Sequence, residues 1–187
     1  MLYHVSPTPN LHNLTPRISS HHKPFVYAID NLTTALLFGA RKDDFDFLLD
    51  TDAQNRPVLY ECYPDAFQKI YQGKNCSVYE LEDTGFNRNV TGWPPELVCE
   101  TPVPVVRETA VPDLYQRLLE EEKAGRLTIH RYTQTPEYRR LIAGHIIDRL
   151  IRFHLLEHFS TTDPRGQRYF RPLVTGLMAL TDGHLLP

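Results

Sequence analysis

The chain has 187 residues, of which 41% are hydrophobic and 23% charged, and its formal net charge is −3 with the nine histidines neutral. This composition is that of an ordinary globular protein, long enough for one domain or for a domain with an appendage. The small net charge gives no broad attraction to nucleic acid or anionic lipid, and no apolar run approaches the roughly 20 residues that span a bilayer.

The first third of the chain is expected to form two short strands and one helix. Residues 2–6 make a short strand that two prolines end. The polar stretch 10–24 is rich in turn residues, and the β-branched and aromatic run 25–29 predicts a second strand. Asp30 or Asn31 then caps a helix with apolar residues at helical spacing.

The middle third alternates strands with a short helix. Residues 41–56 are acidic and leave their structure open. Strands are expected over 58–63, 77–82 and 96–106, the last with two prolines that place its second half at a sheet edge or bulge. The segment 64–74 opens with Pro-Asp and contains a glycine near its end, which predicts a short helix.

Beyond about residue 110 the pattern becomes helical. A helix is expected over 111–127 and a long one over 136–159, followed by a short apolar helix over 170–180. The run Glu120–Glu122 is expected to be a solvated helix face. We therefore predict an α+β protein, with a β-rich domain over 1–108 and a helical extension over 109–187 packed on it.

The cysteine pattern and the start of the chain bear on location. Cys62, Cys76 and Cys99 lie far apart and form no CxxC pair, which argues against a disulfide scaffold or a zinc knuckle. The start also lacks the basic and apolar regions of a signal peptide. We expect a cytoplasmic protein with reduced thiols and no membrane partner.

Four motifs stand in a recognisable order: LYHVSP, PFVYAID with a helix behind it, VYELED, and a later strand opened by glutamate. Over about residues 1–106 this order resembles the ADP-ribosyltransferase superfamily, in particular its small bacterial rifampin-type and DNA-targeting members. The resemblance implies a split antiparallel β core. It also implies that the protein binds NAD as a substrate and transfers ADP-ribose to an acceptor, which the sequence leaves open among protein, nucleic acid and small molecule.

The resemblance assigns roles to His4 and Tyr27. His4 would hydrogen-bond a ribose hydroxyl of NAD, since imidazole donates from one nitrogen and accepts at the other. Tyr27 would stack its ring on the cationic nicotinamide. Each residue also has a purely structural interpretation, as a half-buried strand histidine bonded to the backbone and as a core tyrosine.

The resemblance also calls for a catalytic acid. Glu96 opens its strand, where a carboxylate would stabilise the positive charge that grows on the ribose as nicotinamide leaves. Glu100 is the fallback. In rifampin-type enzymes the acid instead lies in the loop after the VYELE-like strand, where this chain has Asn89. Either Glu96 is the acid, or the acid is missing and the protein is an inactive nucleotide- or protein-binding module with the same fold.

The loop before the second strand borders the NAD site in the family. Its Ser19, Ser20 and His21 would then contact ribose or phosphate, unless the loop is simply solvated. Arg17 would pair with the pyrophosphate, because a guanidinium matches phosphate oxygens in a bidentate fork.

A competing motif lies near the C-terminus. His154, Glu157 and His158 form an HxxEH pattern, in which two histidines share a helix face to bind zinc and the glutamate acts as a base. A zinc hydrolase is thus a second alternative, set against an amphipathic helix whose apolar face, if exposed, favours a homodimer. Candidates for the third zinc ligand are Asp163, Asp182 and His184.

Overall fold

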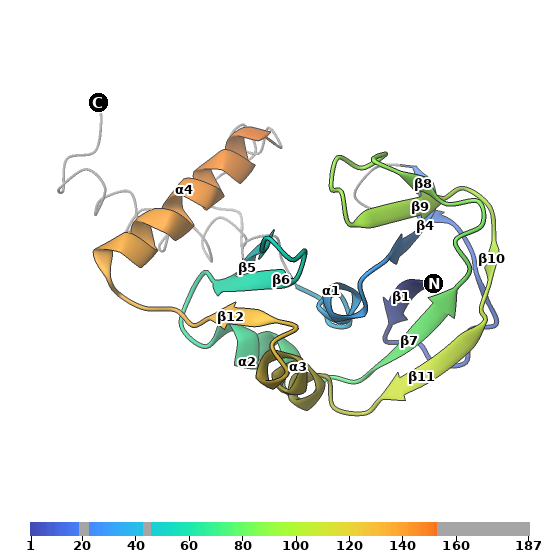
Figure 1. The fold of residues 1–187 in the computed structure, drawn as a ribbon, viewed down its shortest axis with the longest axis horizontal. Coiled ribbons are helices and arrows are strands. Elements are labelled where there is room, and N and C mark those ends of the chain that lie inside the picture. The colour runs from blue at the N-terminus through green and yellow to red at the C-terminus, as the bar shows by residue number, and fades with distance from the viewer. Residues whose placement is uncertain (19–22, 43–45, 153–187) are drawn as a thin grey trace, which may run out of the picture. The chain divides into compact units, whose positions relative to one another are not determined.

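The computed structural model describes residues 1–18, 23–42 and 46–152 (Figure 1). In this part of the chain the fold is α+β, as the sequence predicted, and it has four helices and antiparallel strand pairs. The strands are β1 (Leu2–Ser6), β2 (Asn13–Leu14), β3 (Arg17–Ile18), β4 (Pro24–Ile29), β5 (Phe47–Thr51), β6 (Pro57–Glu61), β7 (Cys76–Leu81), β8 (Asn87–Arg88), β9 (Glu96–Cys99), β10 (Val103–Pro104), β11 (Arg107–Val111) and β12 (Thr128–His130). The helices are α1 (Leu32–Leu36), α2 (Ala66–Tyr71), α3 (Leu114–Lys123) and α4 (Pro136–Arg152).

The described residues divide into two compact units. The first takes its described residues from 1–18, 23–42, 51–57 and 67–128, and the second from 46–50, 58–66 and 129–152. Strand structure continues past residue 108, because β11 extends to Val111 and β12 follows α3. The chain therefore alternates between the units instead of completing one before it begins the other.

The first unit is built on one large antiparallel sheet in the order β11-β7-β1-β4-β9-β8, with β3 beside β4. The N-terminal strand β1 lies in the middle of this order. It pairs with β7 over all five of its residues, from Leu2 opposite Leu81 to Ser6 opposite Ser77. On its other side β1 pairs with β4 through Tyr3 opposite Ile29.

Residues that oppose one another across antiparallel strands share a face of the sheet, so the register assigns every side chain to one of two faces. On one face, here called the core face, Leu2 of β1 lies with Ala28 of β4, Tyr79 of β7 and Leu97 of β9. The buried cluster on this face consists of Leu2, Leu14, Val26, Ala28, Tyr79, Leu81, Leu97, Cys99 and Val103.

The opposite face, here called the helix face, lies against α1 and α3. Its residues include Val5 and Val78, which oppose each other on β1 and β7. At the end of α1 the backbone of Gly39 comes so close to this face that a Cβ atom there would lie 2.9 Å from Cys76 Sγ and from Leu114 Cδ2. A larger residue at this position would therefore force the Cys76 or Leu114 side chain to shift.

Side-chain caps begin two helices of the first unit, α1 and α3. Asn31 Oδ1 accepts from the Thr34 backbone N–H at 2.9 Å, so of the two predicted caps of α1 the asparagine is correct. Asp113 Oδ1 accepts from the Gln116 N–H at 3.0 Å and begins α3. Such caps satisfy backbone donors that have no partner within the helix.

One expectation about α3 is wrong. Glu120 is exposed, as predicted, but the neighbouring side chain of Glu121 is only 1% exposed. Leu114, Leu118 and Glu121 follow an i, i+4, i+7 spacing, which places all three on the buried side of the helix. The position in the helical period outweighs the acidic composition of the run.

The second unit contains a three-stranded sheet, in the order β12-β6-β5, and α4. Tyr138 of α4 donates its hydroxyl to the Glu61 and His130 carbonyls, both at 2.9 Å, which ties the helix to β6 and β12. No helix in the described residues is both long and apolar enough to cross a membrane. The buried cluster of this unit consists of Leu48, Cys62, Ile142 and Ile146.

Candidate functional site

His4 lies where β1 and β4 stop pairing. The two strands pair through Tyr3 opposite Ile29, and a continued ladder would place Val5 opposite Tyr27. Instead the His4 side chain reaches the neighbouring strand, and its Nδ1 lies 2.8 Å from the Tyr27 carbonyl oxygen. Since a carbonyl only accepts, Nδ1 must carry the proton in this hydrogen bond.

The surroundings of His4 keep its imidazole neutral. Burial lowers the pKa of His4 below its ordinary value of 6.5, the bond to the Tyr27 carbonyl opposes this, and the charge of Arg17 lowers the pKa further. A neutral ring with its proton on Nδ1 has a lone pair on Nε2. No described residue hydrogen-bonds to Nε2, so this nitrogen can accept from a ligand hydroxyl.

Arg17 is the charged residue whose field lowers the pKa of His4. It lies on β3 opposite Phe25, is exposed, and makes no ion pair with any residue that the structure describes. Its guanidinium offers a charged donor for an anionic group. The charge of Arg17 therefore acts on His4, and both are residues that the sequence analysis assigned to NAD.

Tyr27 and Glu96 lie on the helix face. In the pairing of β4 with β9, Tyr27 is opposite Val98 and Ile29 is opposite Glu96. Tyr27 and Glu96 are therefore diagonal neighbours, a separation of roughly 7–8 Å that an aromatic ring can bridge. The Glu96 backbone N–H donates to the Trp93 carbonyl at 3.0 Å, which fixes the start of β9.

The three predicted residues do not all face one side of the sheet. His4 opposes Tyr79 of the core face, and the two rings are 6.4 Å apart between centroids, whereas Tyr27 and Glu96 belong to the helix face. The link between them is the Tyr27 carbonyl, which holds the imidazole. The backbone bond also matches the structural interpretation of His4, so the functional interpretation depends on Nε2 and Arg17.

Two further positions bear on the catalytic acid: Glu100, the fallback, and Asn89, which stands where rifampin-type enzymes have their acid. Glu100 is exposed in the bend after β9. Asn89 has φ 61°, in the left-handed region that asparagine tolerates better than most residues, so a turn explains its presence at this position.

Several candidates lie outside the described residues. These are Ser19, Ser20 and His21, the HxxEH residues His154, Glu157 and His158, and the candidate third zinc ligands Asp163, Asp182 and His184. Within the described ranges, no three His, Cys, Asp or Glu side chains are grouped so that they could hold a metal ion.

An aromatic pair near Glu96 was missed from the sequence. The rings of Phe38, after α1, and Trp93, before β9, lie 5.5 Å apart between centroids, and Lys42 Nζ is 4.0 Å from the centre of the Phe38 ring. The only tryptophan of the chain, in the loop sequence GWPP, was the available signal.

Comparisons with known proteins find no matching family model, no similar curated protein and no matching solved structure.

Proposed function

We propose that this protein binds NAD where β1, β3, β4 and β9 meet and cleaves its bond between nicotinamide and ribose, passing ADP-ribose to an acceptor. The observation that carries the proposal is the state of His4. Burial and the charge of Arg17 lower its pKa, which favours the neutral ring, its Nδ1 proton is engaged by the Tyr27 carbonyl, and no described residue hydrogen-bonds to its Nε2. An ADP-ribosyltransferase-like core would use an imidazole in this way.

The chemistry assigns one task to each residue. His4 Nε2 accepts from a ribose hydroxyl, Arg17 pairs with the pyrophosphate, and the Tyr27 ring contacts the nicotinamide. As the bond from the ribose C1′ to the nicotinamide nitrogen breaks, nicotinamide leaves neutral and positive charge grows on the ribose. The Glu96 carboxylate stabilises that charge until the acceptor bonds to C1′ and loses its proton.

The opposite faces of His4 and Glu96 set a condition on this proposal. The ribose must lie where β1 and β4 are no longer paired. Only at that place could one ligand contact His4 on one face of the sheet and Glu96 on the other. The single pairing of Tyr3 with Ile29 leaves the rest of this strand boundary without a ladder, which supports such a position.

The test measures NAD binding by calorimetry and nicotinamide release by chromatography. We expect wild type to release nicotinamide and Glu96→Gln to bind NAD while its turnover falls by a factor on the order of 100. Glu100→Gln tests the fallback acid: if Glu96 has the role, this variant keeps full activity, and a comparable loss of turnover would assign the role to Glu100. If wild type neither binds nor cleaves NAD, the proposal fails.

A second candidate is an NAD-binding module without turnover. It is favoured by Asn89, a turn residue at the position where rifampin-type enzymes have their acid. Wild type that binds NAD, loses binding in His4→Ala and releases no nicotinamide would establish this candidate over the enzyme.

A further inference from the structure

A pocket of about 490 Å³ opens on the helix face at the opposite edge of the sheet from the proposed NAD site. It lies over β7 and β11 and is bordered by α1 and α3. Its volume is in the range of small-molecule sites. Its apolar floor consists of Leu32, Leu36, Val78 and Val111.

A carboxylate and a guanidinium meet in this pocket. The side chain of Glu80 is only 14% exposed, whereas that of its partner Arg107 is 68% exposed. Arg107 Nε and Nη2 both donate to Oε1 of Glu80, the first at 2.9 Å. No described residue hydrogen-bonds to the second oxygen, Oε2. A mostly buried carboxylate thus depends on a cation whose own side chain is largely in solvent.

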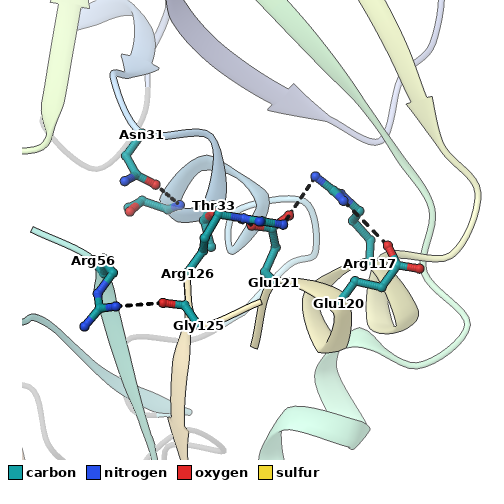
Figure 2. Close-up of polar contacts among 9 residues, drawn as sticks. Asn31, Thr33, Arg56, Arg117, Glu120, Glu121, Gly125 and Arg126 are labelled. Atoms are coloured by element: carbon teal, nitrogen blue, oxygen red, sulfur yellow. Dashed lines mark hydrogen bonds and ion pairs between the residues drawn. The ribbon is translucent and has the colours of Figure 1, made fainter. Parts of the chain in front are cut away.

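The other lining cation, Arg117, is held elsewhere. Figure 2 shows its guanidinium between Glu121 and Glu120, at 2.7 Å from the buried Glu121 and 3.5 Å from the exposed Glu120. Glu121 also accepts from Arg126 and from the Thr33 hydroxyl. Arg117 is therefore not available to bind an anion in the pocket.

The lining carries more acid than base. The pocket is lined by three acidic residues, Glu80, Asp113 and Glu120, and by two basic ones, Arg107 and Arg117. Both arginines already form ion pairs with glutamates of the protein. Asp113 uses Oδ1 for the cap of α3. Carboxylate oxygens above the apolar floor therefore remain able to accept hydrogen bonds. Such a lining suits a cationic ligand that carries an apolar chain.

We propose that this pocket binds an alkylguanidine, with Glu80 as the counterion and Arg107 as the side chain that the ligand displaces. Arg107 already shows that a guanidinium fits on Glu80, and its exposure means that it leaves for solvent at small cost. The apolar floor accepts the methylene chain of the ligand, and Asp113 or Glu120 meets a second cationic end. The site is separate from the proposed NAD site and does not depend on it.

The experiment titrates agmatine into the full chain by calorimetry. We expect Glu80→Gln to weaken binding at least about tenfold, because the counterion is lost. Arg107→Ala should strengthen binding about tenfold, since the competing internal guanidinium is gone. Arg88→Ala, which changes an exposed arginine paired with Asp30 and Asp83, should leave the affinity unchanged.

The change in agmatine affinity caused by Arg107→Ala tests the proposal most directly. A loss of affinity, or no agmatine binding to either wild type or Arg107→Ala, overturns the proposal. 4-Guanidinobutanoate, which replaces the second cation by a carboxylate, should bind more weakly than agmatine. Thermal melts verify that each variant is folded, and NAD cleavage measured in parallel separates this proposal from the preceding one.

Discussion

His4 is held neutral by burial and by the charge of Arg17, against the opposing effect of the Tyr27 carbonyl. These effects leave Nε2 unprotonated, and so the imidazole of His4 takes up its second proton less readily in the folded state than in the unfolded chain. A single side chain therefore links a property of the candidate site to the stability of the protein.

We predict that lowering the pH destabilises the protein through His4. In the unfolded chain this histidine takes up a proton near pH 6.5, while in the folded chain it does so only at lower pH. The unfolded state therefore binds more protons, and stability falls as pH decreases from about 6.5 towards the folded-state pKa. Urea unfolding at pH 7.5 and 5.5 should show a larger loss in wild type than in His4→Gln, whose amide can still donate to Tyr27.

Nuclear magnetic resonance tests the same prediction directly. The His4 ring should remain the Nδ1–H tautomer at pH 7 and titrate below 6.5. A His4 that titrates at or above that value, or equal pH effects on both proteins, would contradict it.

The strands that hold His4 and Tyr27 were predictable from LYHVS and FVYAI, but their faces were not. Each face follows from the register of Tyr3 with Ile29, and a shift by one residue would exchange the two faces of a strand. Register depends on pairing between segments about 25 residues apart, and composition within either segment does not encode it.

At the scale of elements, one buried carboxylate joins two helices of the first unit. Glu121 of α3 accepts from the Thr33 hydroxyl of α1 at 2.7 Å and from Arg126 Nε at 2.6 Å, and it pairs with Arg117 (Figure 2). Burial would raise the pKa of Glu121, but these donors and charges together lower it below its usual value. The charged form is therefore the one that the fold requires.

We predict that Glu121→Gln destabilises the protein by about 2 kcal/mol at pH 7, because it removes charge-assisted hydrogen bonds from a buried position. The exposed Glu120→Gln is the matched control and should change stability by less than about 0.5 kcal/mol. Chemical denaturation of the three proteins measures both differences.

The pH dependence of this difference has a definite sign. A carboxyl whose pKa is lowered by folding stabilises the protein above its unfolded pKa, and the contribution is lost as pH falls through the folded pKa. The gap between wild type and Glu121→Gln should therefore shrink in acid. A gap that is absent at pH 7 or that grows in acid would contradict the assigned role.

The sequence marks the ends of its helices clearly, but it does not reveal its short strands. Pro136, Asp113 and Gly125 mark helix ends through local chemistry, and Gly125 has the left-handed φ of 70° expected there. The strand β5 lies inside the acidic stretch 41–56, and β12 has only three residues. Their stability comes from the pairing partner β6, which a local pattern does not reveal.

For the whole molecule, the change in composition near residue 110 does not coincide with the division into compact units. The first unit includes α3 and the second begins with residues from the middle of the chain. Helical periodicity marks where elements change type, whereas compact units depend on which distant segments pack together. The prediction of two regions, 1–108 and 109–187, used only the first kind of information.

The three cysteines, all within the described part of the chain, report on both units. Cys76 and Cys99 are buried in the first unit and Cys62 in the second, and none forms a disulfide. Burial raises the pKa of the Cys76 thiol to about 11. Because the thiolate is the reactive form, its population at pH 8 is reduced by roughly 100-fold relative to a thiol that titrates near 9.

We predict that native protein at pH 8 reacts with a chromogenic disulfide reagent far more slowly than the unfolded chain, in which all three thiols react at once. Mass spectrometry of alkylated peptides then follows each cysteine as denaturant is raised. Cys62 reacting before Cys76 and Cys99 would mean that the second unit opens first, and equal rates would mean one cooperative unfolding step. A cysteine that reacts in native buffer at the rate of a free thiol would contradict the burial described for its unit.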